Sequence, residues 1–533
     1  MAGIEAKGAV MEPQIRTLVD ISESKAALTG RADLLLERAQ WASQVFQRYG
    51  REQTLAIVDA VAAKAHEMAG HFAEAAVRET GFGVAAHKTL KNELTAKPLV
   101  DFYRNEDFVT PRIDEARKMV SIPRPAGVVF ALVPSTNPIA TINFKVLLSL
   151  MTRNAVVISP HPAARACCVE ACHLLAEAAV AAGAPDGIVQ VVEQPSIPLI
   201  EELMSSPKTA VILATGGTAM VRAAYSSSNP AIGVGPGNAP VFVDSSAEIE
   251  AAAKRIVESK SFDNSILCTN ESTLITLPEV DQRLRQALQR NGAHLCSEAE
   301  VERLRGYLFH DRGFNVEALG RDATWIAKAC GIRVAAKTRI LVAPIEKIGI
   351  EEPLSREKLC PVLAYHLAKS RGQAIAQARA LLRLSGAGHS AAIHAMDEEV
   401  AMAYAAAVEC YRVVVNAPCS QGAAGLGTHL APSFTIGTGY FGHSSIGENI
   451  GPQHLVHWTR MAYSDDPAVQ MGNYQGRGPR LDGPLPQAPS DGVPGLSMVP
   501  TSAPAPSSGG IDAGVREELR RLIAEELRDL LGQ

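Results

Sequence analysis

Short apolar runs alternate with helical segments between residues 120 and 244, and no other feature constrains the fold as strongly. The runs are five or six residues long and rich in valine, as strands buried on both faces of a parallel sheet are. Because helical patterns separate the runs, the sequence predicts parallel βαβ units and a doubly wound α/β sheet. The runs are residues 128–133, 155–159, 188–192, 210–214 and 240–244.

The loops after three of these runs begin at Pro134, Ser159 and Thr215. Ligands of doubly wound sheets bind at the carboxyl ends of the strands, so we expect the functional site at these loops. The glycine-rich segment 233–237 is interpreted as a turn. A strand rather than a helix follows it, which argues against a dinucleotide-binding fingerprint.

Breaks in pattern and composition divide the chain of 533 residues into several parts. One late segment contains nine prolines with many glycines and serines, cannot bury a core and is interpreted as a linker. The expected parts are a first α/β domain over residues 1–237 with a hairpin near 107–123, a second α/β domain over 238–434, a return segment over 435–464, the linker over 465–510 and a terminal amphipathic helix over 511–533.

Composition excludes several classes of protein. Hydrophobic residues make up 47% of the chain and charged residues 20%, the profile of a soluble enzyme. The net charge of −5 gives no basic face for nucleic acid, and no apolar run reaches the roughly 18 residues that cross a bilayer. We therefore expect no nucleic-acid partner, no membrane association and a cytoplasmic location. The nine irregularly spaced cysteines predict reduced thiols.

Two patterns imitate metal sites. His66 and His71 are five residues apart, whereas two histidines on one face of a helix need a spacing of four. Cys167, Cys168 and Cys172 lie on one predicted helix, where adjacent residues point in different directions, and small core residues are the simpler interpretation. We expect no metal.

Cys268 is the candidate nucleophile. It follows a helical run and the turn-like residues Phe262, Asp263 and Asn264, and it precedes the strand-like residues 272–277. A thiol presented at such a helix-to-strand junction, among small and polar neighbours, can be activated without a metal. The alternative is a buried cysteine that serves as a small hydrophobic side chain.

Several short motifs together resemble the aldehyde dehydrogenase superfamily over roughly residues 30–460. The resemblance is strongest to its CoA-acylating branch, which includes the propionaldehyde and acetaldehyde dehydrogenases of bacterial microcompartments. It implies the fold of that family, with a cofactor-binding first domain and a catalytic second domain. The motifs are residues 134–138, 159–162, 261–270, 356–363, 388–390, 412–416 and 446–455.

The resemblance implies catalytic roles for two further residues. Asn137 matches the asparagine that, with the backbone N–H of Cys268, holds the developing oxyanion; the alternative is an ordinary turn residue before Pro138. Glu357, in a Glu-x-x-x-Pro-Val motif, matches the glutamate that bonds the nicotinamide ribose, and its alternative is a solvated surface glutamate.

The cofactor implied is NAD. Across the adenosine half, Ser159 stands where hydrolytic members usually carry a lysine, and Ser159, Pro160 and His161 resemble the acylating branch. Gly216, Gly217 and Thr218 form a strand-to-helix turn, whose backbone amides can approach the pyrophosphate.

One difference between this sequence and the hydrolytic members of the family indicates which reaction to expect. Hydrolytic members carry a glutamate that activates water, and no carboxylate stands at the matching place near Val234. The resemblance therefore implies that coenzyme A removes the acyl group from Cys268, giving acyl-CoA and NADH from a short-chain aldehyde such as acetaldehyde or propionaldehyde. The alternatives are a hydrolytic aldehyde dehydrogenase and a mainly structural docking protein. Sulfoacetaldehyde as substrate and NADP as oxidant stay open.

The tail has apolar residues on one helical face. Linker and helix together resemble the encapsulation peptides that recruit enzymes into bacterial microcompartments, so residues 511–533 are expected to bind shell proteins and place the enzyme in the lumen. A self-associating helix or one without a partner is the alternative. The family's habit implies a dimer or tetramer through 107–123 and 446–463. The apolar positions are Val515, Leu519, Leu522, Ile523, Leu527, Leu530 and Leu531.

Overall fold

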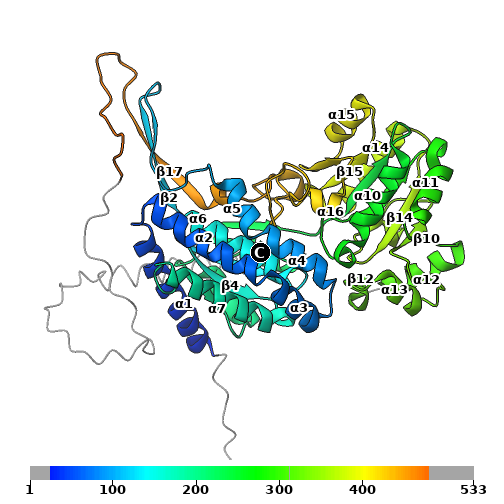
Figure 1. The fold of residues 1–533 in the computed structure, drawn as a ribbon, viewed down its shortest axis with the longest axis horizontal. Coiled ribbons are helices and arrows are strands. Elements are labelled where there is room, and N and C mark those ends of the chain that lie inside the picture. The colour runs from blue at the N-terminus through cyan, green and yellow to red at the C-terminus, as the bar shows by residue number, and fades with distance from the viewer. Residues whose placement is uncertain (1–23, 311–312, 479–533) are drawn as a thin grey trace, which may run out of the picture. The chain divides into compact units, whose positions relative to one another are not determined.

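The apolar runs of the first half form a five-stranded parallel sheet of order β5-β4-β3-β6-β7 in the computed structural model, which describes residues 24–310 and 313–478 (Figure 1). Every residue of its central strand β3 is buried, which explains why the run is continuously apolar instead of alternating. The chain adds β4 and β5 on one side of β3 and β6 and β7 on the other, so the strand order reverses between β3 and β6. The strands are β3 (Val128–Val133), β4 (Ala155–Pro160), β5 (Val189–Val191), β6 (Val211–Thr215) and β7 (Ala231–Val234).

Helices pack on this sheet according to their apolar patterns. All residues of α6 are buried, because it lies between the sheet and α2, α4 and α7. α1 contacts β3, β4 and β5 and packs on α8. The helices are α1 (Lys25–Phe46), α2 (Arg51–Glu67), α3 (Ala69–Thr80), α4 (Ala85–Leu94), α5 (Lys97–Tyr103), α6 (Pro138–Met151), α7 (Arg165–Ala181), α8 (Ile197–Ser205) and α9 (Thr218–Tyr225).

A seven-stranded parallel sheet of order β10-β13-β14-β9-β8-β15-β16 follows. Its side chains alternate between two cores: Val241 and Val243 of β8 pack with α10 and α11, whereas Phe242 packs with α14 and α15. The strands are β8 (Ala239–Val243), β9 (Glu271–Thr276), β10 (Ala293–Leu295), β13 (Ile340–Pro344), β14 (Val362–Leu367), β15 (Ala391–His394) and β16 (Val413–Val415). The helices are α10 (Ile249–Ser261), α11 (Pro278–Arg290), α12 (Glu298–Leu308), α13 (Ala323–Ala329), α14 (Arg371–Leu384), α15 (Glu398–Ala407) and α16 (Cys419–Gly422).

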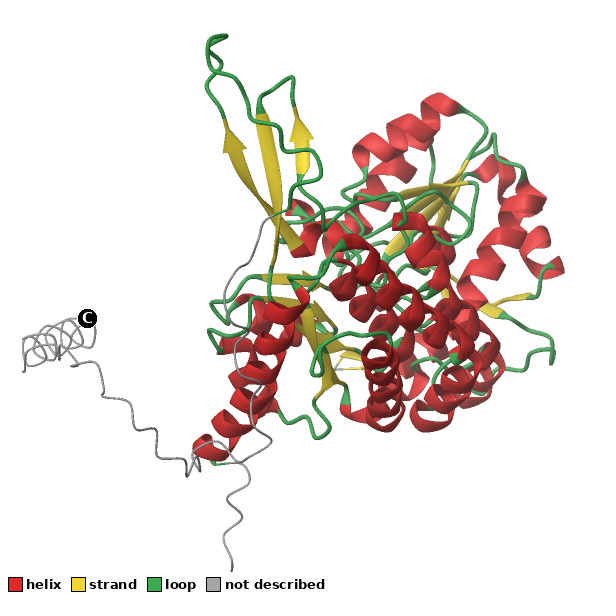
Figure 2. Ribbon diagram, turned by 60° about the vertical axis from the view of Figure 1, so that its left-hand side comes forward, coloured by secondary structure: helices red, strands yellow, loops and turns green. Residues whose placement is uncertain are grey.

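The expected hairpin is present as β1 (Arg112–Asp114) paired antiparallel with β2 (Met119–Pro125). β17 (Val456–Ala462) joins the other edge of β2, which brings the end of the described chain back to its first half (Figure 2). Arg112 lies over the ring of Trp458, 4.1 Å from its centroid, and reinforces this three-stranded sheet. A two-stranded sheet of β11 (Phe309–His310) and β12 (Gly313–Phe314) completes the strands of the described residues.

The predicted fold class is confirmed, with three local results to report. The interpretation of 233–237 as a turn is wrong for Gly233 and Val234, which lie in β7. Gly233 is a packing glycine, since an added Cβ would lie 2.6 Å from Val221 Cγ1. His66 and His71 lie on two different helices, α2 and α3. Cys167, Cys168 and Cys172 lie on α7 and are buried in the core.

Residues 465–478, the described part of the predicted linker, contain no helix or strand. The terminal helix predicted for 511–533 lies outside the described residues. Among the helices that the structure describes, none combines the length and the apolar character needed to cross a membrane.

Asn154 ties the first sheet to the return segment. Its Oδ1 accepts the Gly127 N–H at 2.7 Å and its Nδ2 donates to the Leu455 carbonyl at 3.0 Å, both in the interior. Asn154→Ala would leave the Gly127 N–H unpaired and the Leu455 carbonyl with only its bond from the Ala126 N–H, so we expect a loss of about 1 to 3 kcal/mol in unfolding free energy and a lower melting temperature. Asn291→Ala is the control, because that amide bonds only a carbonyl of its own helix. Equal melting temperatures of the two variants would contradict this role of Asn154.

Candidate functional site

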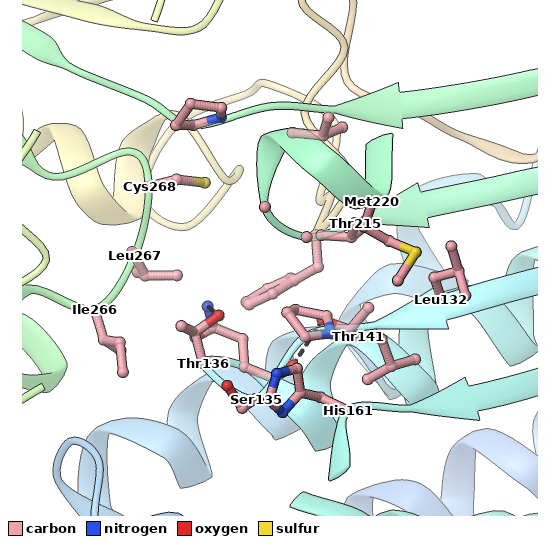
Figure 3. A pocket seen from close by; sticks show the side chains of 18 of the residues that line it. Leu132, Ser135, Thr136, Thr141, His161, Thr215, Met220, Ile266, Leu267 and Cys268 are labelled. Atoms are coloured by element: carbon pink, nitrogen blue, oxygen red, sulfur yellow. Dashed lines mark hydrogen bonds between the residues drawn. The ribbon is translucent and has the colours of Figure 1, made fainter. Parts of the chain in front are cut away.

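A cavity of about 360 Å³ opens where β3, β4, β6 and β7 end. The loops after these strands form one wall, at the point where the strand order reverses, which is where doubly wound sheets bind ligands. The loop that carries Cys268 forms the facing wall, and Figure 3 shows Cys268 across the cavity from Ser135 and His161. The sequence-predicted location of the site therefore coincides with this cavity.

Most of the predicted site residues line the cavity together. Thr218 is the exception: it begins α9 and is exposed at the rim of the same loop. The roles assigned to these residues from the resemblance remain predictions. The lining members of the predicted set are Asn137, Ser159, Pro160, His161, Gly216, Gly217, Cys268 and Glu357.

Cys268 differs from the other cysteines of the chain. All nine are free thiols, and Cys268 is the one that is only partly buried. It lies between a single 3-10 turn, Phe262–Ser265, and β9, at the helix-to-strand junction predicted from the sequence. Cys268 therefore lines the cavity, and its role as nucleophile stays a prediction.

Unusual backbone geometry brings the cysteine to the cavity. Asp263, Asn264 and Ser265 have φ angles of 48°, 53° and 61°, in the left-handed region that non-glycine residues rarely adopt. Asn264 holds this turn by donating its side-chain N–H to the Gly320 carbonyl at 2.9 Å. On the far side, Gly237 approaches so closely that a Cβ there would lie 1.9 Å from the Cys268 carbonyl oxygen.

The resting thiol is protonated. Burial, followed by the nearby carboxyl of Glu357, raises the pKa of Cys268 to about 12. Burial also raises the pKa of Glu357 to about 8, although the backbone N–H of Gly237 donates to its Oε1 at 3.0 Å. With these pKa values the thiol of Cys268 is neutral at pH 7 and the carboxyl of Glu357 is mostly neutral.

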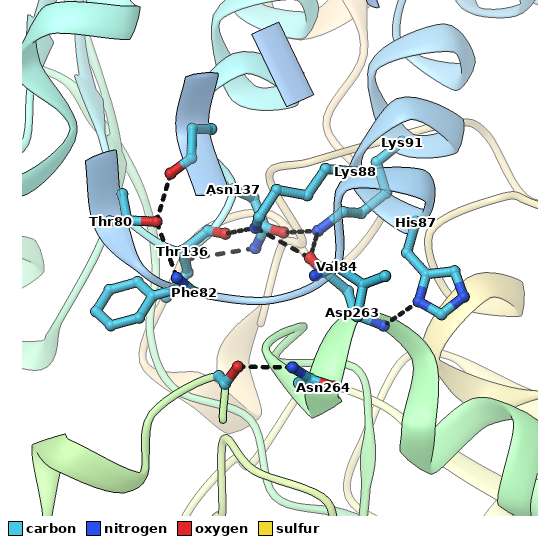
Figure 4. A network of polar contacts seen from close by, with 12 residues as sticks. Thr80, Phe82, Val84, His87, Lys88, Lys91, Thr136, Asn137, Asp263 and Asn264 are labelled. Atoms are coloured by element: carbon cyan, nitrogen blue, oxygen red, sulfur yellow. Dashed lines mark hydrogen bonds and ion pairs between the residues drawn. The ribbon is translucent and has the colours of Figure 1, made fainter. Parts of the chain in front are cut away.

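Asn137 precedes the first residue of α6 and faces the cavity. Its Oδ1 accepts a hydrogen bond from Lys91 Nζ, and its Nδ2 lies 3.4 Å from Thr136 Oγ1 (Figure 4). The carboxamide is therefore held by its oxygen, while its N–H₂ group has only a weak partner. An N–H group aimed into a partly enclosed site is suited to stabilise an oxyanion.

The other wall fits a dinucleotide cofactor. Ser159 Oγ is buried without a hydrogen-bond partner among the described residues, and it lines the cavity. Open space surrounds the position that a Cβ of Gly217 would take, so a ligand can approach the backbone of this strand-to-helix turn. A free hydroxyl and an accessible glycine turn at the strand-order reversal fit the pyrophosphate and ribose of such a cofactor.

Two of the motifs that carry the resemblance, near residues 388 and 412, are joined to each other by hydrogen bonds. Arg412 is buried and donates to the carbonyls of Gly388 at 2.7 Å and His389 at 2.8 Å. His389 is buried and its Nε2 has no partner among the described residues, while burial lowers its pKa to about 3. The imidazole is therefore neutral at pH 7.

One group of potential metal ligands lies together within residues 24–310 and 313–478, outside the cavity. The ligand atoms of His294, Cys296 and Glu300 are all within 4.8 Å of one another. The Glu300 carboxylate already accepts the Ser297 N–H at 2.8 Å as part of a helix cap. We assign no metal to this group.

Sequence reasoning missed Lys88 and Lys91. Both lie on α4, both are buried, and both bond the carboxylate of Asp263 beside the catalytic loop. A lysine is almost always solvated, so a helical pattern gives no reason to place one in the interior. The only sign of a shared role in the sequence was their spacing of three residues, which places both lysines on one face of the helix.

Residues 5–301 match the aldehyde dehydrogenase family. Among curated proteins, the chain is similar to an aldehyde-alcohol dehydrogenase of Clostridium acetobutylicum, with 38% identity over 440 residues, 81% of this chain and 51% of that protein. The chain spans about half the length of the first curated relatives it matches.

The similar solved structures match this chain over nearly their whole length. An acetylating aldehyde dehydrogenase from Geobacillus thermoglucosidasius is 36% identical with a TM-score of 0.81, covering 82% of this chain and 97% of that one. A propionaldehyde dehydrogenase from the fucose utilisation microcompartment of Clostridium phytofermentans is 30% identical, with a TM-score of 0.75 and coverage of 82% and 98%. A Rhodopseudomonas palustris propionaldehyde dehydrogenase with bound propionyl-CoA is 29% identical, with a TM-score of 0.73 and coverage of 81% and 94%. The resemblance inferred from the motifs is confirmed, and the chain belongs to the aldehyde dehydrogenase family.

Proposed function

We propose that this chain oxidises a short-chain aldehyde to an acyl-CoA, with a nicotinamide dinucleotide as oxidant and Cys268 as nucleophile. The observation that carries the proposal is the pairing of Cys268 and Asn137 across one cavity whose described lining contains a single carboxyl group, Glu357. Val234 stands at the place where hydrolytic members carry their water-activating glutamate, and it lines the cavity without any acidic function.

The chain's own residues account for the acylation step. Cys268 Sγ bonds to the aldehyde carbon as its proton leaves, and the carbonyl oxygen becomes negative. The Asn137 N–H₂ group and the backbone N–H of Cys268 stabilise this charge, while the enclosed cavity limits competing water. A dinucleotide whose pyrophosphate is held by the 216–217 turn and whose nicotinamide ribose is bonded by Glu357 would accept the hydride. Cys268 is then left as a thioester.

Coenzyme A completes the reaction as a substrate. Its thiolate displaces Cys268 from the acyl group and restores the thiol. The similarity to acetylating members, and to a propionaldehyde dehydrogenase with bound propionyl-CoA, supports this step. The choice between NAD and NADP is left open by the cavity, and we propose NAD from the motif around Ser159.

The lining supports a small, uncharged aldehyde. Ile266, Leu267, Leu359 and Phe434 are apolar residues that line the same cavity as Cys268. None of the described lining residues is a lysine or arginine, so a sulfonate such as that of sulfoacetaldehyde would lack a cationic partner. We therefore propose acetaldehyde or propionaldehyde as substrate.

We also propose that the enzyme is cargo of a bacterial microcompartment. The similar propionaldehyde dehydrogenase of Clostridium phytofermentans comes from such a compartment. Residues 465–510 and 511–533 have the sequence pattern of a linker followed by an amphipathic address, expected to bind shell proteins. A dimer or tetramer through the β1-β2-β17 sheet is proposed on the family's habit.

The first prediction concerns the dependence on CoA. Purified enzyme with NAD⁺ and propionaldehyde should produce sustained NADH only when CoA is added, because no glutamate activates water against the thioester. Without CoA we expect a burst of about one NADH per active site. Cys268→Ala should abolish both phases, while Cys330→Ala, a buried thiol outside the cavity, should change neither.

Equal steady-state rates with and without CoA would contradict the acylating mechanism. In that case Glu357, the remaining carboxyl, would be the candidate base for a hydrolytic enzyme. Loss of the CoA-independent rate in Glu357→Gln would then identify it.

The second prediction concerns the raised pKa of Cys268. Because that pKa is about 12, the thiolate fraction and the rate of alkylation by iodoacetamide should rise roughly tenfold per pH unit between pH 7 and 9. Above pH 8, where Glu357 ionises, Glu357→Gln should be alkylated faster than the wild type, and below pH 7 equally fast. Inactivation rates and peptide mass spectrometry measure this. A plateau below pH 8 would refute a thiol held neutral by its surroundings.

The third prediction concerns the tail. Deletion of residues 511–533 should leave kcat and KM unchanged but abolish co-purification with shell proteins. A scrambled segment of the same composition is the control, since it keeps the charge and removes the apolar face. Unchanged co-purification after deletion, or loss of soluble activity, would rule out this address.

A further inference from the structure

Four side chains form a buried polar network directly behind the cavity wall. Lys88 and Lys91 from α4 both donate to Asp263 Oδ2, Lys88 at 3.1 Å (Figure 4). Lys91 also donates to Asn137 Oδ1. The network joins a helix of the first half, the catalytic turn and the residue that begins α6.

The two lysines make different second contacts. Lys88 Nζ donates to the backbone carbonyl of Thr136 at 3.0 Å, whereas Lys91 Nζ donates to the side chain of Asn137. Only Lys91 therefore touches a group proposed to act on the substrate. Since both lysines pair with the same carboxylate from the same helical face, Lys88 is a matched reference for every effect that comes from Asp263 alone.

The contact with Lys91 selects one orientation of the Asn137 carboxamide. An asparagine side chain can present either its oxygen or its N–H₂ group in a given direction, and an ammonium group can only donate. Lys91 therefore fixes the oxygen toward the interior. The N–H₂ group is left on the opposite branch, with only Thr136 Oγ1 at 3.4 Å.

Asp263 keeps Lys91 in place and opposes the loss of its charge. Its Oδ1 accepts the Val84 N–H at 2.6 Å, and burial, which would raise its pKa, is outweighed by Lys91 and Lys88, so the net shift is downward. Burial lowers the pKa of Lys91 to about 7 despite Asp263, and the positive charge of Lys91 favours the thiolate of Cys268. Lys91 makes the smallest of the contributions to the pKa of Cys268, so the main action of the network is the hydrogen bond that orients the asparagine.

We propose that Lys91 is a positioning residue of the oxyanion site, which holds the Asn137 carboxamide with its N–H₂ group toward the oxygen of the substrate; this inference rests on the proposed function of Cys268 and Asn137. Lys91 does not touch the substrate, since it lies outside the cavity lining among the described residues. Its effect on the reaction passes through Asn137.

A purely structural role makes a different prediction. If Lys91 only bound α4 to the catalytic turn, Lys88→Met and Lys91→Met would lower activity and stability to similar extents. Loss of the Lys91 ammonium group would also reduce activity whether or not Asn137 were present. A double-mutant cycle between positions 91 and 137, with Lys88 as reference, separates the two roles.

The experiment measures the rate of the first NADH formed per active site, with saturating NAD⁺ and propionaldehyde and without CoA. This burst reports acylation alone, so it does not depend on whether CoA or water removes the acyl group. Asn137→Ala should slow the burst about 100-fold, as loss of an oxyanion donor does. Lys91→Met should slow it roughly 10- to 100-fold, and Lys88→Met roughly threefold or less.

The double variant decides the question. If Lys91 acts through Asn137, Lys91→Met should slow the burst no further in the Asn137→Ala background. Multiplied effects in the double variant, or equal effects of Lys88→Met and Lys91→Met, would overturn the proposal. A small effect of Asn137→Ala would instead refute the proposed oxyanion role itself, which keeps the two failures distinguishable.

Lys91→Arg completes the design, because a methionine at position 91 leaves Asp263 with one cationic partner and can impair folding. Arginine keeps the charge and the N–H donors but carries them in a planar fork of different reach. We expect a melting temperature close to that of the wild type with a slower burst, and the slowing should again vanish in the Asn137→Ala background. A slowing that persists in that background would overturn the proposal.

Discussion

The bond between the Asp263 carboxylate and the lysines of α4 is the interaction on which the catalytic geometry depends. Three consecutive left-handed residues precede Cys268, and such conformations cost about 1 to 3 kcal/mol each. Breaking a buried ion pair by removing one partner costs about 3 to 5 kcal/mol. The ion pairs of Asp263 and the Asn264 hydrogen bond to Gly320 therefore contribute enough free energy to hold a turn that its local sequence disfavours.

Much of the fold was predictable because it follows from short periods along the chain. The run 128–133 is buried on every side and is therefore continuously apolar, and the loops at Pro134, Ser159 and Thr215 end neighbouring parallel strands. Strand ends in one parallel sheet meet at one edge, so their residues share a cavity. Topology alone thus predicted the location of the site.

The network behind the site was not predictable in the same way. Lys91 and Asp263 are 172 residues apart, and no local pattern relates them. The burial of two lysines becomes intelligible only when a carboxylate from another part of the chain is brought against them. Gly233 was mistaken for a turn residue for a related reason: the side chain of Val221 that requires a glycine there comes from a neighbouring helix.

The charges of the cavity explain how a protonated Cys268 could serve as the selective nucleophile that we propose. With the pKa of Cys268 near 12 and that of Glu357 near 8, the resting site has no negative charge at pH 7 and little tendency to react with oxidants or alkylating agents. Negative charge develops only when an aldehyde is present, on its oxygen and opposite the N–H groups that stabilise it. Once the proposed thioester has formed, the described lining residues include no second carboxylate that could take a proton from a water molecule attacking it. A thiol substrate can ionise by itself and needs no such base. The scarcity of acidic groups in the cavity therefore favours attack on the thioester by a thiol over attack by water.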